Sequence, residues 1–332
     1  MNAQTTQALA VDDFIARTPG AGVLQKIWGD ALAEAGARDS RIICLCADVS
    51  SPTEADRFRD RLPERFYQVG IAEANMVGIA AGMARMGDIP FIHSFCVFAT
   101  KRCYDQLTMQ VAYPRLNMKI VGFMPGLTTD LGVTHQAIED VALMRVMPNM
   151  TVLEPAGQEQ YRSAVATALE IDGPVYLRMM RAYGDENPER LDHPLEVGKG
   201  YVIEEGGHGA IFATGMMVQE ARRAAAELRA EGLHVTVVNM SSIKPLDHEL
   251  VIQLAAKTGA VVTAENHSII GGLGSAVAET LMEAGVSCAF RRIGVRDTFA
   301  EGASTPYLFD KYGLSARSIA LACRETIASR RN

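Results

Sequence analysis

Short apolar runs alternate with stretches of helical periodicity along most of this chain. The runs at 42–46 and 89–95, IICLC and IPFIHSF, have the length and the β-branched or aromatic content of buried strands. Between such runs, segments such as 72–86 and 159–171 have the length and apolar spacing of helices. Because parallel strands must be joined by crossover connections, this alternation predicts an α/β fold whose sheet is largely parallel.

The alternation stops once and then resumes, which predicts two domains. The polar stretch RAYGDENPERLDHPLEVGKG carries Pro188 and Pro194, and a new strand pattern, GAIFAT, follows it. A length of 332 residues also suits two domains. We expect each domain to have a largely parallel sheet flanked by helices. The expected segments are an N-terminal arm, a first domain, a linker and a second domain, at 1–21, 22–187, 188–197 and 198–332.

Composition and charge exclude several classes of protein. Apolar residues make up 48% of the chain and charged residues 21%, as in a globular protein with a sizeable core. The net charge of -7 is spread along the chain without a basic stripe, so nucleic acid is not an expected partner. We expect no signal peptide and no membrane span, because no basic start precedes an apolar run and no apolar run is long enough. The expected location is the cytoplasm.

An acidic residue, Glu73, stands near the start of the apolar stretch FYQVGIAEANMVGIAAGMAR. Small residues recur every four positions along this stretch, at Gly70, Ala74, Gly78 and Gly82. They leave one helix face bare, so that another backbone can approach it closely, as at a subunit interface. A carboxyl group at the mouth of such a helix is poorly hydrated and can hold or release a proton. The alternative is a structural role, in which Glu73 compensates the N-terminal amides and dipole of the helix.

Two further segments combine aromatic and ionisable residues. The segment HSFCVFATKRCYDQ places Phe95 and Phe98 three residues apart, between His93 and Arg102. Two such rings can hold a flat ring by offset stacking, or they can belong to the core. In GVTHQAIED, His135 follows Thr134 at the expected start of a helix. A histidine there can donate a proton or can cap the helix.

Four blocks together resemble the C-terminal half of transketolase, and especially the short B chains of split transketolases. The blocks are VGIAEANMVGIAAGMA, PFIHSFCVFATKRCYDQ, GVTHQAIEDVALMRVMPNMTVLEPA and PVYLRM, in this order. The resemblance continues through ENHSIIGGLGSAV and covers about residues 22–330. It implies a pyrimidine-binding domain followed by a transketolase C-terminal domain. It also implies a transferase that uses thiamine diphosphate to move a two-carbon ketol unit from a ketose (phosphate) to an aldose (phosphate).

The resemblance assigns roles toward the cofactor to four residues. Glu73 corresponds to the glutamate that hydrogen-bonds N1′ of the aminopyrimidine and drives its imino tautomer. Phe95 and Phe98 correspond to the aromatic residues that hold the pyrimidine ring. Asp48, in ADVS, corresponds to an acidic residue close to the cofactor at the dimer contact.

The resemblance also assigns roles toward the substrate. His135 corresponds to an active-site histidine near the reacting carbonyl, and Arg178 to an arginine that grips the substrate phosphate, a role that suits a forked guanidinium. The loop TTDLGVTH departs from the pattern GEDGATH of many split transketolases. Leu131 stands where an aspartate would recognise a substrate hydroxyl, and Asp130 is the candidate to replace it. Met124 stands near the place of a histidine that binds the substrate phosphate. The sugar can therefore differ from ordinary pentose phosphates.

The motif that holds the diphosphate group through Mg²⁺ is missing from this sequence. Thiamine diphosphate enzymes use GDG with a later asparagine, and here Gly-Asp at 29, 87 and 184 is not followed by glycine. We therefore expect no metal ligand in this chain. The expected partner is an A chain that carries the diphosphate and Mg²⁺ site, in an α₂β₂ heterotetramer.

Two other functions remain as alternatives. The β subunit of a 2-oxo acid dehydrogenase E1 component also has two α/β domains and a catalytic glutamate, but the segment around Phe95 fits transketolase better. A non-catalytic binding or regulatory protein on the same fold is the other alternative, and the presence of Glu73, Phe95, Phe98 and His135 together argues against it. The role of His267, before GGLGSAV, stays open between facing the active site and capping.

Overall fold

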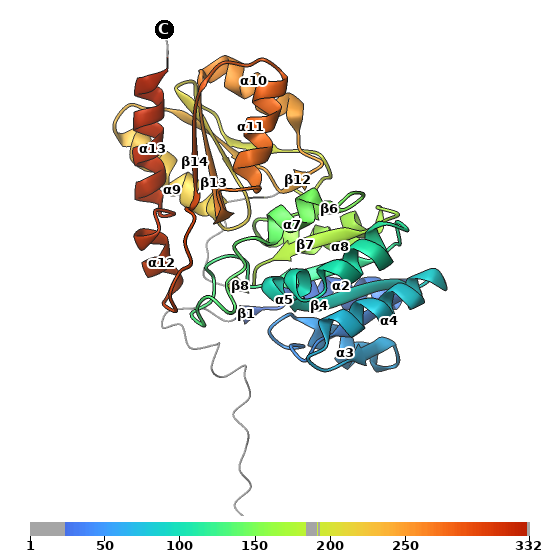
Figure 1. Ribbon diagram of the computed structural model, residues 1–332. Helices are drawn as coiled ribbons and strands as arrows, with labels where there is room; N and C mark the ends of the chain where they lie inside the picture. The colour runs from blue at the N-terminus through green and yellow to red at the C-terminus, as the bar shows by residue number, and fades with distance from the viewer. Residues whose placement is uncertain (1–23, 184–190, 192, 331–332) are drawn as a thin grey trace, which may run out of the picture.

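Seven strands form the first sheet of the computed structural model, which describes residues 24–183, 191 and 193–330 (Figure 1). Their order across the sheet is β12-β6-β7-β5-β4-β2-β3, and only β12 runs antiparallel to its neighbour. The bounds are β2 (Ile42–Cys46), β3 (Phe66–Gln68), β4 (Ile89–Phe95), β5 (Lys119–Phe123), β6 (Thr151–Leu153), β7 (Val175–Met179) and β12 (Ser242–Lys244). The central strands are buried on both faces, which explains why they read as continuous apolar runs.

Helices cover both faces of this sheet. On one face α2 packs against α3 and α8, and Trp28 of α2 meets Phe91 and His93 of β4. Ser94 points the other way, toward α4, because successive residues of a strand alternate between its faces. The helices and helical turns of this part are α2 (Ile27–Arg38), α3 (Ala55–Arg61), η1 (Pro63–Arg65), α4 (Glu73–Arg85), α5 (Cys96–Lys101), α6 (Tyr104–Gln106), π-helical η2 (Leu107–Ala112), α7 (Asp140–Val146) and α8 (Gln158–Leu169).

The second sheet has five strands in the order β14-β13-β10-β11-β9, parallel except for β9. Ile211 packs with α9 and α13 on one face, and Phe212 packs with α10 and α11 on the other. The elements are β9 (Tyr201–Glu204), β10 (Gly209–Ala213), α9 (Met217–Ala230), β11 (Val235–Asn239), α10 (His248–Thr258), β13 (Ala260–Ser268), α11 (Leu273–Glu283), β14 (Ala289–Val295), α12 (Thr305–Lys311) and α13 (Ala316–Ser329). Each sheet therefore has its own core.

Strand pairing, as well as the linking segment, joins the two halves of the chain. Strand β12 leaves the second half and adds an edge to the first sheet, where Glu154 N donates to Ser241 O at 2.8 Å. Figure 1 shows β12 at the junction between the two sheets. Near the start of the described chain, β1 (Leu24–Gln25) pairs with β8 (Ala182–Tyr183). These short strands were not expected, because two or three residues carry no readable periodicity.

The predicted fold class is confirmed: two largely parallel sheets are each flanked by helices. Two details were wrong. Gly70 has a φ of 72° and lies before α4, so it is not part of the small-residue helix face. The helix expected to start at His135 begins only at Asp140. The N-terminal arm at 1–21 lies outside the described residues, and so does most of the first half of the linker. No helix among the described residues is long and apolar enough to cross a membrane.

Candidate active site

The residues singled out for cofactor chemistry gather at the carboxyl edge of the first sheet. Asp48 follows β2, Glu73 opens α4 after β3, and Phe95 ends β4. The loop that carries Asp130 and His135 follows β5. Parallel strands end at the same edge of a sheet, and this edge is where ligands bind in open α/β sheets. The topology therefore places segments distant in sequence around one location.

Glu73 is buried, with 3% of its surface exposed, and its carboxylate contacts two side chains. Ser94 Oγ donates to Oε1 at 3.2 Å, and Arg102 Nη1 lies 3.4 Å from Oε1 and 3.3 Å from Oε2. These distances are long for charge-assisted hydrogen bonds. Glu73 is also the acidic residue in the first turn of α4, where its charge interacts favourably with the helix dipole, so the structural alternative stays open beside the functional one. Because both present contacts are weak, the buried carboxylate can form a stronger hydrogen bond with a bound ligand.

Three rings form a cluster beside Glu73. The centroid of Phe98 lies 5.1 Å from that of His135 in an edge-to-face arrangement. Phe95 lies 6.1 Å from Phe98 and 6.3 Å from His135. Phe95 also belongs to the core of the first sheet, whereas Phe98 and His135 are half-buried. The core alternative therefore holds for Phe95, yet the same ring contributes to a partly open aromatic wall.

Arg102 links the carboxylate to the aromatic cluster. Its guanidinium carbon lies 3.8 Å from the centroid of Phe98, as in a cation–π contact, and its side chain is 47% exposed. Partial burial lowers the pKa of His135, and the charge of Arg102 lowers it further. The imidazole is therefore neutral near pH 7. Arg102 had no predicted role, although its spacing of four residues from Phe98 at the end of α5 favours such a contact.

The loop of His135 is a turn and not the start of a helix. His135 N donates to Gly132 O at 2.9 Å, and Thr134 Oγ1 lies 2.9 Å from Nδ1 of His135. Asp130, in the same loop, is exposed. Asp48 is also exposed and has a φ of 60°, a conformation that Asp tolerates better than most residues. Roles of Asp48 and Asp130 toward cofactor and substrate stay predictions.

Arg178 does not reach this site, and its predicted contact with a substrate phosphate is wrong for the structure described here. Its side chain is 0% exposed, and every side of the guanidinium has a protein partner. Nε donates to Asp140 Oδ2 at 2.7 Å and Nη1 to Glu154 Oε1 at 2.6 Å. Nη2 donates to the carbonyl oxygens of Ala137 and Asn266 at 3.0 and 2.9 Å. Although burial alone would raise the pKa of Asp140, Arg178 brings it below its usual value. Arg178 is an internal ion-pair residue.

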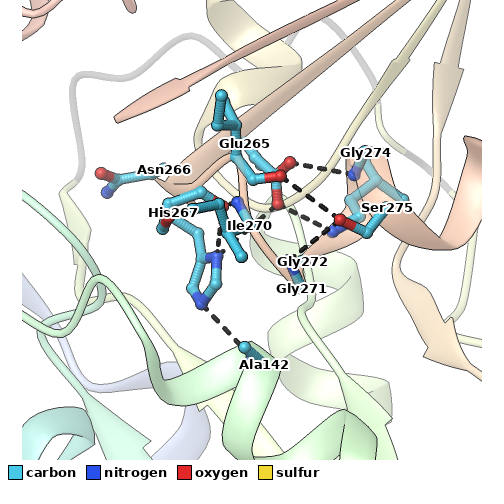
Figure 2. Close-up of polar contacts among 12 residues, drawn as sticks. Ala142, Glu265, Asn266, His267, Ile270, Gly271, Gly272, Gly274 and Ser275 are labelled. Atoms are coloured by element: carbon cyan, nitrogen blue, oxygen red, sulfur yellow. Dashed lines mark hydrogen bonds and ion pairs between the residues drawn. The ribbon is translucent and has the colours of Figure 1, made fainter. Parts of the chain in front are cut away.

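His267, whose role was open, caps a helix from the other half of the chain. Figure 2 shows its ring pointing toward Ala142 at the first turn of α7. Ala142 N donates to Nε2 at 3.3 Å, and Nδ1 lies 2.7 Å from Ser268 O. The ring is fully buried, which lowers the pKa of His267. A neutral imidazole with Nδ1 protonated satisfies both contacts. No group of three or more His, Cys, Asp or Glu within the described part of the chain is placed to hold a metal ion.

Two family models match the chain, one for each sheet. The model described as transketolase, pyrimidine binding domain matches residues 23–184. The model described as transketolase, C-terminal domain matches residues 198–319. The candidate site lies within the first match, and His267 lies within the second.

Relatives with curated descriptions match over most of the chain. A protein named 6-deoxy-6-sulfo-D-fructose transketolase subunit SqwH, from Clostridium sp. (strain MSTE9), is 47% identical over 312 residues, which are 93% of this chain and 95% of that protein. A 1-deoxy-D-xylulose-5-phosphate synthase from Geobacter sulfurreducens is 35% identical over 94% of this chain and 49% of its own length. A solved structure described as a split gene transketolase, inactive beta4 tetramer, has a TM-score of 0.84 at 45% identity, with 92% of this chain and 98% of that chain covered.

Replacement of Arg178 should destabilise the folded chain, because its side chain is an internal ion-pair partner. Arg178→Met leaves Asp140 and Glu154 buried without their counter-charge, so we expect the free energy of unfolding to fall by about 3–5 kcal/mol. Urea unfolding at pH 7 measures this loss. Arg38→Met is the control, because Arg38 forms an exposed pair with Glu34 at 3.6 Å and should change stability by less than about 0.5 kcal/mol. If Arg178→Met were as stable as the wild type and lost only substrate affinity, the predicted contact of Arg178 with a substrate phosphate would be restored.

Removal of the Arg102 charge should raise the pKa of His135. In Arg102→Met the imidazolium of His135 no longer faces a nearby cation, so its pKa should move up toward the ordinary histidine value. Arg102→Lys keeps a positive charge and should move it less. The shift of the His135 ring protons with pH, followed by NMR, gives all three values. An unchanged pKa in Arg102→Met would mean that Arg102 does not act on His135.

Proposed function

The chain belongs to the transketolase family, and from that premise we propose that it is the B subunit of a two-chain, thiamine diphosphate-dependent transketolase. In this proposal the assembled enzyme moves a two-carbon ketol unit from a ketose to an aldose. The observation that carries it is the buried carboxylate of Glu73, next to a partly open wall of Phe95, Phe98 and His135 at the carboxyl edge of a parallel sheet. Thiamine diphosphate, when bound, supplies the electron sink that cleavage of a bond next to a carbonyl requires.

The residues of this chain fit the aminopyrimidine end of that cofactor. Glu73 would hydrogen-bond the ring nitrogen N1′, since its carboxylate is buried and makes only long contacts to Ser94 and Arg102. Phe95 and Phe98 would orient the ring by stacking and edge contacts. Asp48, at the end of the neighbouring strand β2, would lie close to the cofactor where the partner chain meets this one.

His135 would act on the sugar. Its neutral imidazole can accept or donate a hydrogen bond at the reacting carbonyl, and its ring lies edge-to-face with that of Phe98. Asp130, exposed in the same loop, would contact a substrate hydroxyl. Arg178 takes no part in this proposal, because its guanidinium is enclosed by protein.

A partner chain would supply the diphosphate and Mg²⁺ site. No GDG motif occurs in the sequence, and the relative SqwH is named a subunit. The small-residue face of α4 is open: a Cβ atom added at Gly82 would meet no atom within 4 Å, and one at Gly78 would meet only Gln110 Oε1 at 3.4 Å. Apolar side chains nearby are also exposed, including Ile79 and Met109. These features support an extensive contact, and an α₂β₂ assembly is its proposed form.

The proposed ketose is 6-deoxy-6-sulfo-D-fructose, the sugar in the name of the relative SqwH. Identity of 47% along 95% of that subunit supports the transfer of this substrate class. Two features of this chain agree with a sugar other than a common phosphate. Leu131 stands where many split transketolases have an aspartate, and Arg178 is not available to a phosphate group. The similar proteins named above include a transketolase subunit and a split gene transketolase, which favours ketol transfer over the 2-oxo acid dehydrogenase alternative.

The proton role of Glu73 can be tested in the assembled complex. Glu73→Gln keeps the shape of the side chain but removes the exchangeable carboxyl proton. We expect exchange of the cofactor's C2 proton with deuterium to slow by about 10²–10⁴-fold, the range of a positioned acid–base group. Quenched-flow NMR measures this rate. Glu34→Gln, at an exposed position on α2, should leave the rate unchanged. A normal exchange rate in Glu73→Gln would remove Glu73 from the mechanism.

Partner dependence and substrate choice can be tested together by reconstitution. The isolated chain should show no ketol transfer, and addition of the chain encoded alongside it should restore transfer. With the complex, kcat/KM for 6-deoxy-6-sulfo-D-fructose should exceed that for fructose 6-phosphate by at least about 10-fold, since the site would be built for a different anion. Full activity of the isolated chain would contradict the split-subunit proposal. Equal use of both sugars would contradict only the substrate assignment.

A further inference from the structure

The loop that carries Asp130 and His135 is closed at its base. We name residues 125–137 the His135 loop. Gly126 N donates to Ala137 O at 3.0 Å, and these two residues form an isolated antiparallel bridge. Contacts that hold Gly126 and Ala137 in place therefore also fix the position of His135.

Asn266, from β13 of the other sheet, hydrogen-bonds two backbone groups at that base. Its Oδ1 accepts from Leu127 N at 2.9 Å, and its Nδ2 donates to Pro125 O at 3.1 Å. Nδ2 also lies 3.5 Å from Met216 Sδ. The side chain is buried, with 1% of the residue exposed. The amide thus replaces the backbone partner that an adjacent strand would offer to residues 125 and 127.

Gly126 shows how closely the two segments approach. Its φ is 53°, and a Cβ atom placed on it would collide with both the carbonyl oxygen and the side-chain oxygen of Asn266. Glycine is required on both counts, because other residues rarely adopt this conformation and none would leave space for Asn266.

The backbone of Asn266 is fixed on either side. In Figure 2 the side chain of Asn266 points away from those of Glu265 and His267, which precede and follow it on β13. Glu265 accepts from Leu273 N and Gly274 N at 2.7 and 2.9 Å at the start of α11, and His267 accepts from Ala142 N. Arg178 then joins the carbonyl oxygens of Asn266 and Ala137. The amide of Asn266 is therefore presented from a rigid frame.

The outer part of the His135 loop also rests on the second half of the chain. Gln136 Nε2 donates to Glu301 O at 3.0 Å, and Thr305 Oγ1 donates to Leu127 O at 3.3 Å. Gly132 packs against Gly302. None of these contacts involves Glu73, whose hydrogen-bond partners Ser94 and Arg102 belong to the first half of the chain.

We infer that Asn266 is a positioning residue, through which the C-terminal domain sets the geometry of the His135 loop and hence the binding of the sugar. This inference rests on the proposed function for its link to the sugar. Loss of the amide leaves Leu127 N buried without a partner, whereas Pro125 O keeps its hydrogen bonds from Thr128 N and Thr128 Oγ1 at 3.2 and 2.6 Å. The base of the loop must therefore open until Leu127 N reaches water or another acceptor. Activation of the cofactor at Glu73 stays independent, because its partners lie elsewhere.

Hydrogen exchange of the isolated chain tests the structural half of the inference without any activity. In Asn266→Ala, amides of residues 125–137 should exchange at least about 10-fold faster, while those of α10 stay unchanged. Gly126→Ala places a methyl group against Asn266 and pushes the His135 loop away from β13. It should therefore also speed exchange in residues 125–137 and leave α10 unchanged. Thr263→Val is the matched control on β13, because its buried Oγ1 has no hydrogen-bond partner among the described residues. Unchanged exchange in 125–137, or faster exchange throughout the chain, would overturn the inference.

Kinetics of the reconstituted complex tests the functional half. Asn266→Ala should raise KM for the ketose by about 10-fold, while the rate of C2 proton exchange of the cofactor stays within about twofold of wild type. A loss of C2 exchange equal to the loss of turnover, with KM unchanged, would overturn the positioning role. Absence of ketol transfer in the wild-type complex would instead refute the proposed function, and hydrogen exchange would still decide whether Asn266 holds the loop.

Discussion

The buried guanidinium of Arg178 is the interaction on which the junction of the two sheets depends. A charge without exposure to water must be matched by partners from the surrounding elements. Those partners are Asp140 at the start of α7, Glu154 after β6, and two carbonyl oxygens from the His135 loop and β13. One side chain therefore fixes elements from both halves of the chain relative to each other. The candidate site lies at the edge that this arrangement supports.

The site divides into two parts that are held by different means. Arg102 contacts both Glu73 and Phe98, and all three residues belong to the first half of the chain. His135 touches this group through its ring but owes its position to a loop held from β13. The proposed proton relay and the proposed sugar-binding loop can therefore respond separately to mutation, because their hydrogen-bond sets are independent.

Local patterns accounted for much of the fold and part of the site. Strands buried on both faces leave continuous apolar runs, so β2, β4 and β5 were readable, and the order of the motifs indicated the family. Arg178 was misassigned because a forked cation suits a phosphate and a buried pair of carboxylates equally well. Asn266 was missed because its partners lie more than a hundred residues away in sequence. Arg102 could have been found from its helical spacing to Phe98.

The sequence by itself determined the α/β architecture, the family, and the presence of an acidic residue at the start of an unusually bare helix. These features are recorded in periodicity and in short motifs, which depend only on near neighbours along the chain. Only the tertiary structure decided which polar residues face the site and which are enclosed, because burial and pairing depend on elements that meet across the two sheets. Glu73 and Arg178 are both buried ionisable residues, and their different surroundings, one weakly partnered and one saturated, separate a candidate proton carrier from an internal brace.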